Sequence, residues 1–294
     1  MKIELFFCLI RIEFYGFQIT LVCKFNFFLL HFNKNIIGMV HVGALPGAPK
    51  NTLYIDKIIQ KALNEATILK EEGVPVLMIE NMHDCPYLNR KVGPEVVSAM
   101  TAISVEIKRE IQLPMGVQIL AGANKEALAV ALAAGLDFIR AEGFVFGHLA
   151  DEGWMNSDAG ELLRYRKQIG AEHIKILTDI KKKHSSHAVS SDVSLEETAK
   201  AAGFFLSDGL IVTGRSTGEK ANVEDVRAVK KGTNLPVIIG SGIDLFNIQD
   251  YWNFADAFIV GSSFKKDGYW ENEVEREKVK KFMQKIDQLQ NQNL

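Results

Sequence analysis

Short apolar runs recur along the chain from Ile36 onward, and amphipathic stretches separate them. Runs of this length, rich in β-branched residues, predict strands, and apolar positions spaced at three and four residues predict helices. The strands are expected at residues 36–41, 76–80, 116–120, 138–141, 174–178, 210–213, 237–239 and 258–260. The helices are expected at residues 56–72, 94–110, 125–134, 158–169, 194–202 and 223–231, within 243–257, and at 274–289.

Eight strands that alternate with eight helices predict a parallel sheet, because a helix must return the chain between parallel strands. Eight such units across residues 36–294 match the roughly 250 residues of a closed (β/α)8 barrel. An open doubly wound sheet is the alternative, but the chain lacks its G-x-G-x-x-G fingerprint. No linker or shift in composition marks a second domain, so we predict one α/β domain, a TIM barrel.

Residues 1–35 differ from the rest of the chain and hold eight of its 18 phenylalanines. Arg11, Glu13 and Lys24 interrupt the apolar stretch, and no small-residue cleavage site follows, which disfavours a signal peptide or a membrane span. One arginine and two glutamates are untypical of a mitochondrial transit peptide. We predict an apolar extension outside a barrel of residues 36–294, a translated segment that is not part of the mature protein; a membrane-seeking leader is the alternative.

Composition narrows the class of function. The net charge of −2 gives no general attraction to nucleic acid or to an anionic membrane. Three cysteines provide neither a disulfide framework nor a zinc-binding spacing. These features favour an intracellular protein, in the cytoplasm or alternatively in mitochondria, without a nucleic-acid partner and with no membrane association of the barrel itself. They are compatible with a homo-oligomer.

The strongest local signal is a pair of small-residue turns after the last two predicted strands. Glycines at strand ends let backbone N–H groups converge, and in β/α barrels the turns after strands seven and eight often bind phosphate. A Cβ at Gly242 or Gly261 would crowd such an anion. Two ordinary glycine turns are the structural alternative. The predicted phosphate-binding residues are Gly240, Ser241, Gly242, Gly261, Ser262 and Ser263.

Barrel enzymes carry their chemistry at the carboxyl ends of the strands. Side chains alternate along a strand, so Lys175 and Asp179 are expected to point toward the barrel axis while the isoleucines between them face the helices. The predicted catalytic residues are His41, Glu80, Lys175 and Asp179. The predicted substrate-binding residues are Asn81, Gln118, Arg140, Glu142, Thr213 and Arg215, the last in a glycine- and hydroxyl-rich loop.

Structural roles are also open for these residues, because buried ions normally need partners. Glu80 would then pair with Arg140, Lys175 with Asp179 or Glu80, and Asp179 with the lysines that follow it, whereas Glu142 would be solvated and His41 a satisfied core side chain. Residues 183–187 form a candidate lid.

The sequence identifies no cofactor, and we assign no metal ligand. A divalent metal is conceivable at Glu80, His83, Asp84 and Asp179, but their spacing is not diagnostic.

Several strings resemble the BtpA family, in one order across residues 36–285. They include IIGMVHVGALPGAP, ENMHDCPY, GVQILAGANKEALAVALAAGLDFIRAEGFVFGHLADEG, DIKKKHSSHA, LIVTGRSTG and IIGSGI with IVGSSFK. The resemblance implies a barrel of the ribulose-phosphate-binding type. It leaves the activity open, since the family is named for a cyanobacterial member required for photosystem I accumulation and has no agreed catalytic residues. Residues 1–35 match nothing in the family.

Two functions therefore remain. The first is an enzyme that binds a small phosphorylated metabolite and uses acid–base chemistry of the isomerase, lyase or glycosyl type. The second is a non-catalytic assembly or regulatory factor for a membrane or cofactor-bearing complex. Acids, bases and phosphate turns at one barrel mouth favour the enzyme, whereas an exposed apolar patch on the helical shell would favour the second function.

Overall fold

The computed structural model describes residues 7–14, 17–24 and 34–292, and the chain divides into two compact units at residues 31 and 32. The first unit contains one antiparallel hairpin, in which β1 (Phe7–Phe14) pairs with β2 (Phe17–Lys24). Sequence analysis assigned no structure to these residues.

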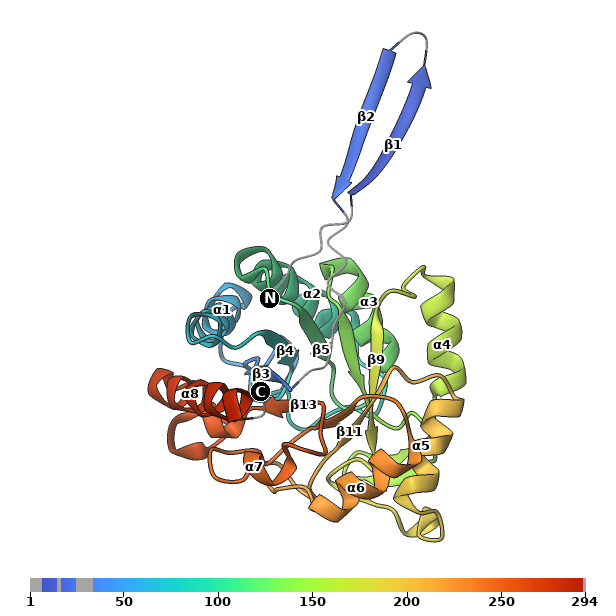
Figure 1. The fold of residues 1–294 in the computed structure, drawn as a ribbon, viewed down its shortest axis with the longest axis vertical. Coiled ribbons are helices and arrows are strands. Elements are labelled where there is room, and N and C mark those ends of the chain that lie inside the picture. The colour runs from blue at the N-terminus through green and yellow to red at the C-terminus, as the bar shows by residue number, and fades with distance from the viewer. Residues whose placement is uncertain (1–6, 15–16, 25–33, 293–294) are drawn as a thin grey trace. The chain divides into compact units, whose positions relative to one another are not determined.

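The second unit is a closed barrel of eight parallel strands inside a ring of helices (Figure 1). Around the barrel the strands are β3 (Asn35–His41), β4 (Val76–Glu80), β5 (Met115–Gln118), β6 (Phe138–Ala141), β9 (Lys175–Ile180), β11 (Gly209–Val212), β12 (Val237–Ile239) and β13 (Ala257–Val260). The helices are α1 (Ile55–Glu71), α2 (Pro94–Ile111), α3 (Asn124–Ala134), α4 (Ala159–Gln168), α5 (Leu195–Phe204), α6 (Val223–Gly232), α7 (Ile248–Tyr251) and α8 (Arg276–Gln292). The predicted TIM barrel is confirmed.

Alternation along the strands separates the shell from the barrel interior. In β4 all five residues are buried, but only Leu77 and Ile79 belong to the apolar core shared with the helices. Met78 and Glu80 point inward instead, and Glu80 ends the strand at the mouth. The same period places Asp179 of β9 inside, as predicted.

A small antiparallel sheet in the loops beside the mouth was not predicted. β7 (His148–Ala150) and β8 (Gly153–Met155) lie in the loop after β6, and β10 (Ser185–Ser186) lies in the loop after β9. β7 pairs with both β8 and β10. These strands are only two or three residues long, so sequence analysis gave the whole segment as loop.

Lys34 binds the start of the first barrel strand to the segment before β13. β3 begins at Asn35, one residue earlier than predicted, and Asn35 pairs with Ala257. The Lys34 ammonium donates hydrogen bonds to the carbonyls of Trp252 and Ala255, the latter at 2.7 Å.

Truncation from the N-terminus is therefore expected to reduce stability once Lys34 is removed. A chain that begins at Phe32 is expected to unfold at the urea midpoint of the full chain, because it keeps Lys34. A chain that begins at Asn35 is expected to lose about 1–3 kcal/mol of unfolding free energy, since two charge-assisted hydrogen bonds disappear. Urea titrations of the three chains measure the difference. A large loss in the chain from Phe32 would show that the preceding residues stabilise the barrel.

Candidate functional site

Glu80 and residues of the two predicted glycine turns line one pocket at the carboxyl ends of the strands. The pocket is partly open to solvent, and its cavity volume is about 30 Å³. Its wall contains His41 of β3, Glu80 of β4 and Arg140 of β6. The same wall includes Gly240, Ser241, Gly242, Gly261 and Ser262, with Lys183, Thr217 and Gly218 from two further loops. We call it the mouth pocket.

Arg140 and Asp179 form a buried, bidentate ion pair. The Arg140 Nε donates to Asp179 Oδ1 at 2.8 Å and Nη2 donates to Oδ2 at 3.0 Å, and the two side chains are 1% and 0% exposed. Burial lowers the pKa of Arg140, but the adjacent Asp179 carboxylate more than offsets this and holds that pKa above its ordinary value. Arg140 is thus a fixed cation, and both oxygens of Asp179 are committed to it. This arrangement favours a holding role for Asp179 over the predicted acid–base role.

Glu80 is not the partner of Arg140. The basic side chain beside it is His41, with 3.8 Å between Glu80 Oε2 and His41 Nε2. Burial raises the pKa of Glu80, partly opposed by the positive charges of Lys183 and Arg140. A carboxyl group with a raised pKa keeps its proton to a higher pH, which suits a general acid. The predicted catalytic placement of Glu80 therefore agrees with its environment.

The environment of His41 defines its tautomer. Its Nδ1 lies 3.2 Å from the Trp270 carbonyl, which can only accept, so Nδ1 carries the proton and Nε2 presents a lone pair. Burial and then the positive charge of Lys265 hold the pKa of His41 well below its usual value. His41 therefore faces Glu80 as a neutral acceptor.

Glu142 is buried, contrary to the solvated alternative. Its Oε2 is enclosed and has no hydrogen-bond partner among the described residues. Burial raises the pKa of Glu142 to about 7. Asn124 at the start of α3 fixes this residue, accepting from its N–H at 3.1 Å and donating to its carbonyl at 2.8 Å. Glu142 lies close enough to Asp179, Arg140 and Glu80 for their charges to influence it, although it lines neither of the two pockets described here.

The other predicted substrate-binding residues divide into two groups. Gln118 Oε1 and Thr213 Oγ1 are buried without hydrogen-bond partners in the described chain, and neither side chain lines the mouth pocket. Asn81 is engaged instead, because it accepts from the Leu120 N–H at 2.7 Å and donates to Asp84 at 3.0 Å. Arg215 is exposed and does not line the mouth pocket.

Lys175 is a correction to the sequence analysis. It is the first residue of β9, its side chain is 50% exposed, and it pairs with Asp208 at 3.2 Å. Four residues of strand span about 13 Å, so Lys175 lies at the opposite end of the barrel from Asp179. Side-chain alternation predicts which face of a strand a residue is on, but not how far it lies from the mouth of the barrel.

Lys183 was predicted as part of the candidate lid but not as a site residue. Lys183 follows β9 and lines the mouth pocket with Glu80 and Arg140. Burial lowers the pKa of Lys183, and the charge of Arg140 lowers it further. The signal was present in the string Asp179–His184, DIKKKH, which starts at a strand end.

The turn after β12 packs against the loop after β11 as well as lining the pocket. A Cβ at Gly242, which has φ +69°, would lie 2.3 Å from the Glu219 carbonyl oxygen, so the backbone of the β11 loop already occupies that space. Ser241 Oγ is also used, accepting from Gly214 N–H at 3.2 Å and donating to the Glu219 carbonyl. Gly242→Asp would therefore disturb the fold itself and cannot isolate a phosphate effect.

The turn after β13 is more open. Gly261, Ser262 and Ser263 begin a short 3-10 helix, η2 (Ser262–Phe264), and no hydrogen bond from the Ser262 hydroxyl is found within the described chain. The Ser263 hydroxyl instead donates to the Ile243 carbonyl. Next to this helix, buried Lys265 forms an ion pair with Glu65 of α1 at 2.6 Å.

The candidate lid is held on two sides. Ser185 and Ser186 pair with Ala150 and Leu149 of β7. On the other side, the N–H of His184 donates to the Arg215 carbonyl at 2.9 Å, and its Nε2 lies 3.0 Å from Thr217 Oγ1. The loops after β6, β9 and β11 therefore form one connected cover.

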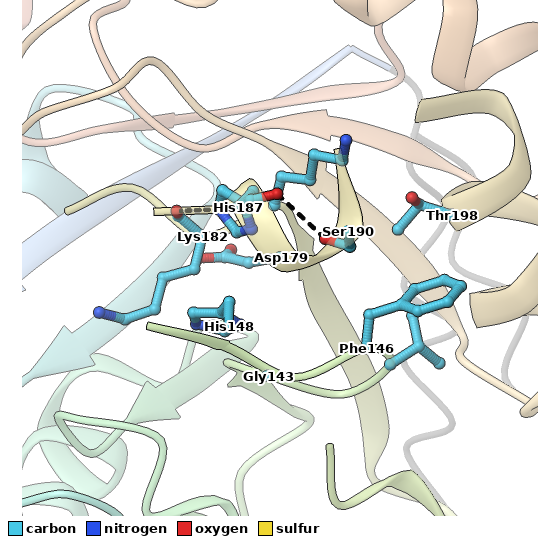
Figure 2. Close-up of a pocket in the computed structure, with 10 residues that line it drawn as sticks. Gly143, Phe146, His148, Asp179, Lys182, His187, Ser190 and Thr198 are labelled. Carbon is cyan, nitrogen blue, oxygen red and sulfur yellow. Dashed lines mark hydrogen bonds between the residues drawn. The ribbon is translucent and has the colours of Figure 1, made fainter. Parts of the chain in front are cut away.

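A second pocket lies under this cover, beside the ion pair. Figure 2 shows His148, Asp179, Lys182 and His187 around it. The two imidazole centroids are 5.1 Å apart, and burial lowers the pKa of His148 to about 4. His148 Nε2 is buried without a partner in the described residues.

The conceivable metal ligands do not assemble. Asp84 accepts hydrogen bonds from the Leu45 N–H at 2.6 Å and from the Asn81 amide, which uses both oxygens. Within residues 7–14, 17–24 and 34–292, no group of three or more His, Cys, Asp or Glu side chains is arranged to hold a metal ion. In the same residues, no helix has the length and apolar character needed to span a membrane.

Asp179 and Glu80 are expected to respond differently to loss of charge. Asp179→Asn leaves buried Arg140 without its ionic partner and is expected to cost about 3–5 kcal/mol of unfolding free energy. Glu80→Gln keeps the shape of a group whose pKa is already raised, and is expected to change stability by less than about 1 kcal/mol. Urea denaturation at pH 7 compares the two. Equal losses would contradict the division of roles.

Glu142 predicts a pH dependence. Its raised pKa means that the folded chain binds its proton more tightly than the unfolded chain, so its contribution to stability is lost as pH rises from about 4.5 to about 7. Glu142→Gln is expected to remove this loss, which is on the order of 3 kcal/mol. The stability of the variant relative to the parent is therefore expected to be higher at pH 8 than at pH 5. Denaturation at both pH values tests this. Greater instability of the variant at pH 8 would show that Glu142 is a required ionic partner.

Relatives of the chain are found by sequence and by structure. A Caenorhabditis elegans protein described as uncharacterized and mitochondrial is 49% identical over 259 residues, covering 86% of this chain and 93% of that protein. The Synechocystis photosystem I biogenesis protein BtpA is 33% identical over 250 residues, covering 85% of this chain and 86% of that one.

Solved structures share the fold at low identity. Thiamine phosphate pyrophosphorylase from Pyrococcus furiosus superposes with a TM-score of 0.54 at 15% identity, covering 88% of this chain and 97% of that one. Phosphoribosyl anthranilate isomerase from Thermus thermophilus gives 0.54 at 13% identity, covering 87% and 99%. The family model for BtpA matches residues 32–288. The chain therefore belongs to the BtpA family.

Proposed function

We propose that this protein is an enzyme that binds a small phosphorylated metabolite in the mouth pocket and uses acid–base chemistry. The observation that carries the proposal is that one pocket combines the two small-residue turns with Glu80, His41 and Arg140. Phosphate sites after strands seven and eight recur in β/α barrels, often with a short extra helix, and η2 has that place. Both barrel neighbours, thiamine phosphate pyrophosphorylase and phosphoribosyl anthranilate isomerase, are named for phosphorylated molecules, which supports the proposal.

The roles follow from the environment of each group. The phosphate group would lie against the turn of Gly261 and Ser262, with Gly218 across the pocket. Glu80, with its raised pKa, would donate or remove the proton, and His41 Nε2 would accept one. Arg140, held by Asp179, would stabilise negative charge that develops on the substrate. Isomerase, lyase and glycosyl-transfer chemistry all fit this set.

An assembly or regulatory role is supported by a different surface. Phe204, Phe205 and Leu206, at the end of α5, are 82%, 45% and 66% exposed. They precede β11 and so lie at the end of the barrel opposite the mouth. Contiguous exposed apolar residues are typical of protein contacts, and the Synechocystis relative is named for photosystem I biogenesis.

We also propose a location. A nematode relative that is 49% identical is described as mitochondrial, which supports a mitochondrial location for this protein over a cytoplasmic one.

Phosphate binding is tested with Ser262→Asp, which puts a carboxylate into the mouth pocket without altering a glycine. Inorganic phosphate and sugar phosphates are expected to raise the Tm of the parent chain, because a ligand at 100 times its Kd stabilises by about 2.7 kcal/mol. Ser262→Asp is expected to abolish the shift through charge repulsion.

Ser98→Asp is the matched control, since it adds the same charge on the exposed face of α2. It is expected to keep the shift. If Ser262→Asp retains the parent's phosphate response, the proposed site is wrong.

A further inference from the structure

We infer that Lys183 is a catalytic nucleophile that forms an imine with the carbonyl carbon of the substrate. The inference rests on the proposed function and narrows it, because the ligand must then be a phosphorylated aldehyde or ketone.

The position of Lys183 carries the argument. Of three consecutive lysines after β9, Lys181 donates to the Val193 carbonyl at 2.8 Å and Lys182 pairs with Glu152 at 3.3 Å. Lys183 lines the mouth pocket, and within residues 34–292 its ammonium has neither a hydrogen bond nor an ion pair at contact distance. It is therefore the member of the run that is free to meet a ligand.

The surroundings of Lys183 supply the conditions for imine formation. An amine must be unprotonated to attack, and burial next to a second cation is a known way to achieve this. Burial and the positive charge of Arg140 lower the pKa of Lys183, against the opposing charges of Glu80, Asp179 and Glu142. Glu80 and His41 face the same pocket, one as a carboxyl group with a raised pKa and the other as a neutral acceptor.

The step balances with these three groups. The Nζ lone pair attacks the carbonyl carbon, and the C=O π electrons move to oxygen, which takes the proton of Glu80. His41 Nε2 removes one proton from the nitrogen and returns it to the new hydroxyl, which leaves as water while the nitrogen lone pair forms the C=N bond. The products are an iminium ion on Lys183, a Glu80 carboxylate and water. Hydrolysis reverses the sequence.

The iminium withdraws electrons from the neighbouring carbon, which makes loss of a proton or cleavage of a carbon–carbon bond easier at that position. This is the shared requirement of isomerase and lyase chemistry on carbonyl compounds. Transfer of a glycosyl group does not need it, so the inference selects between the reaction classes that the mouth pocket allows.

Reductive trapping tests the inference on the full chain. The parent protein is incubated with glycolaldehyde phosphate and sodium borohydride, which delivers hydride to the iminium carbon and leaves a stable secondary amine. Peptide mass spectrometry is expected to place the modification on Lys183, with inorganic phosphate suppressing it. Equal labelling of Lys183 and exposed lysines, without suppression, would overturn the inference.

Two variants distinguish the nucleophilic role of the Lys183 amine from the effect of its positive charge. Lys183→Arg keeps a cation but cannot form the imine, so trapping is expected to vanish while the Tm shift with inorganic phosphate remains. Lys181→Arg, the matched control in the same loop, is expected to keep both. Undiminished trapping in Lys183→Arg would overturn the inference.

The same data distinguish the two proposals. If phosphate binds and Lys183 is not trapped, the imine fails and the phosphate site stands. If glycolaldehyde labels Lys183 as strongly as glycolaldehyde phosphate does, and inorganic phosphate has no effect on the labelling, the phosphate site is wrong and the nucleophile stands.

Discussion

The buried ion pair of Arg140 and Asp179 is the interaction on which the site depends. It crosses from β6 to β9 at full burial and stands between the mouth pocket and the second pocket. Buried charges are tolerated only with good geometry, and two parallel hydrogen bonds supply it. The pair also sets its surroundings, because the charge of Arg140 lowers the pKa of Lys183 while that of Asp179 raises the pKa of Glu142.

The fold was predictable because its signals are local and repeated. Strands and helices differ in the spacing of their apolar residues, so each can be recognised from its own stretch of sequence. Eight strand–helix units in succession then permit few architectures. Ser194 shows how local the information is, since its capping box with Glu197 involves residues only three apart at the start of α5. The sheet of β7, β8 and β10 has no such signal, because it exists only where two distant loops meet.

The sequence predicted which side chains point into the barrel, but not which charged groups pair with one another. Strand alternation correctly placed Glu80 and Asp179 inside, but it cannot say how far along the axis a residue lies, which misplaced Lys175. Choosing a partner for Arg140 requires three-dimensional distances, which a single sequence does not contain. Lys183 and the burial of Glu142 depend on how loops fold back over the mouth, where side-chain periodicity has ended.

The linked loops over the mouth have a consequence for how this family can diversify. Barrel enzymes commonly acquire new chemistry by exchanging one strand-end loop at a time, each independent of its neighbours. Here the loop after β9 is bound to β7 on one side and to Thr217 on the other. An insertion in any of these loops must be matched by changes in its partners, so the loops over the mouth would change in concerted rather than single steps.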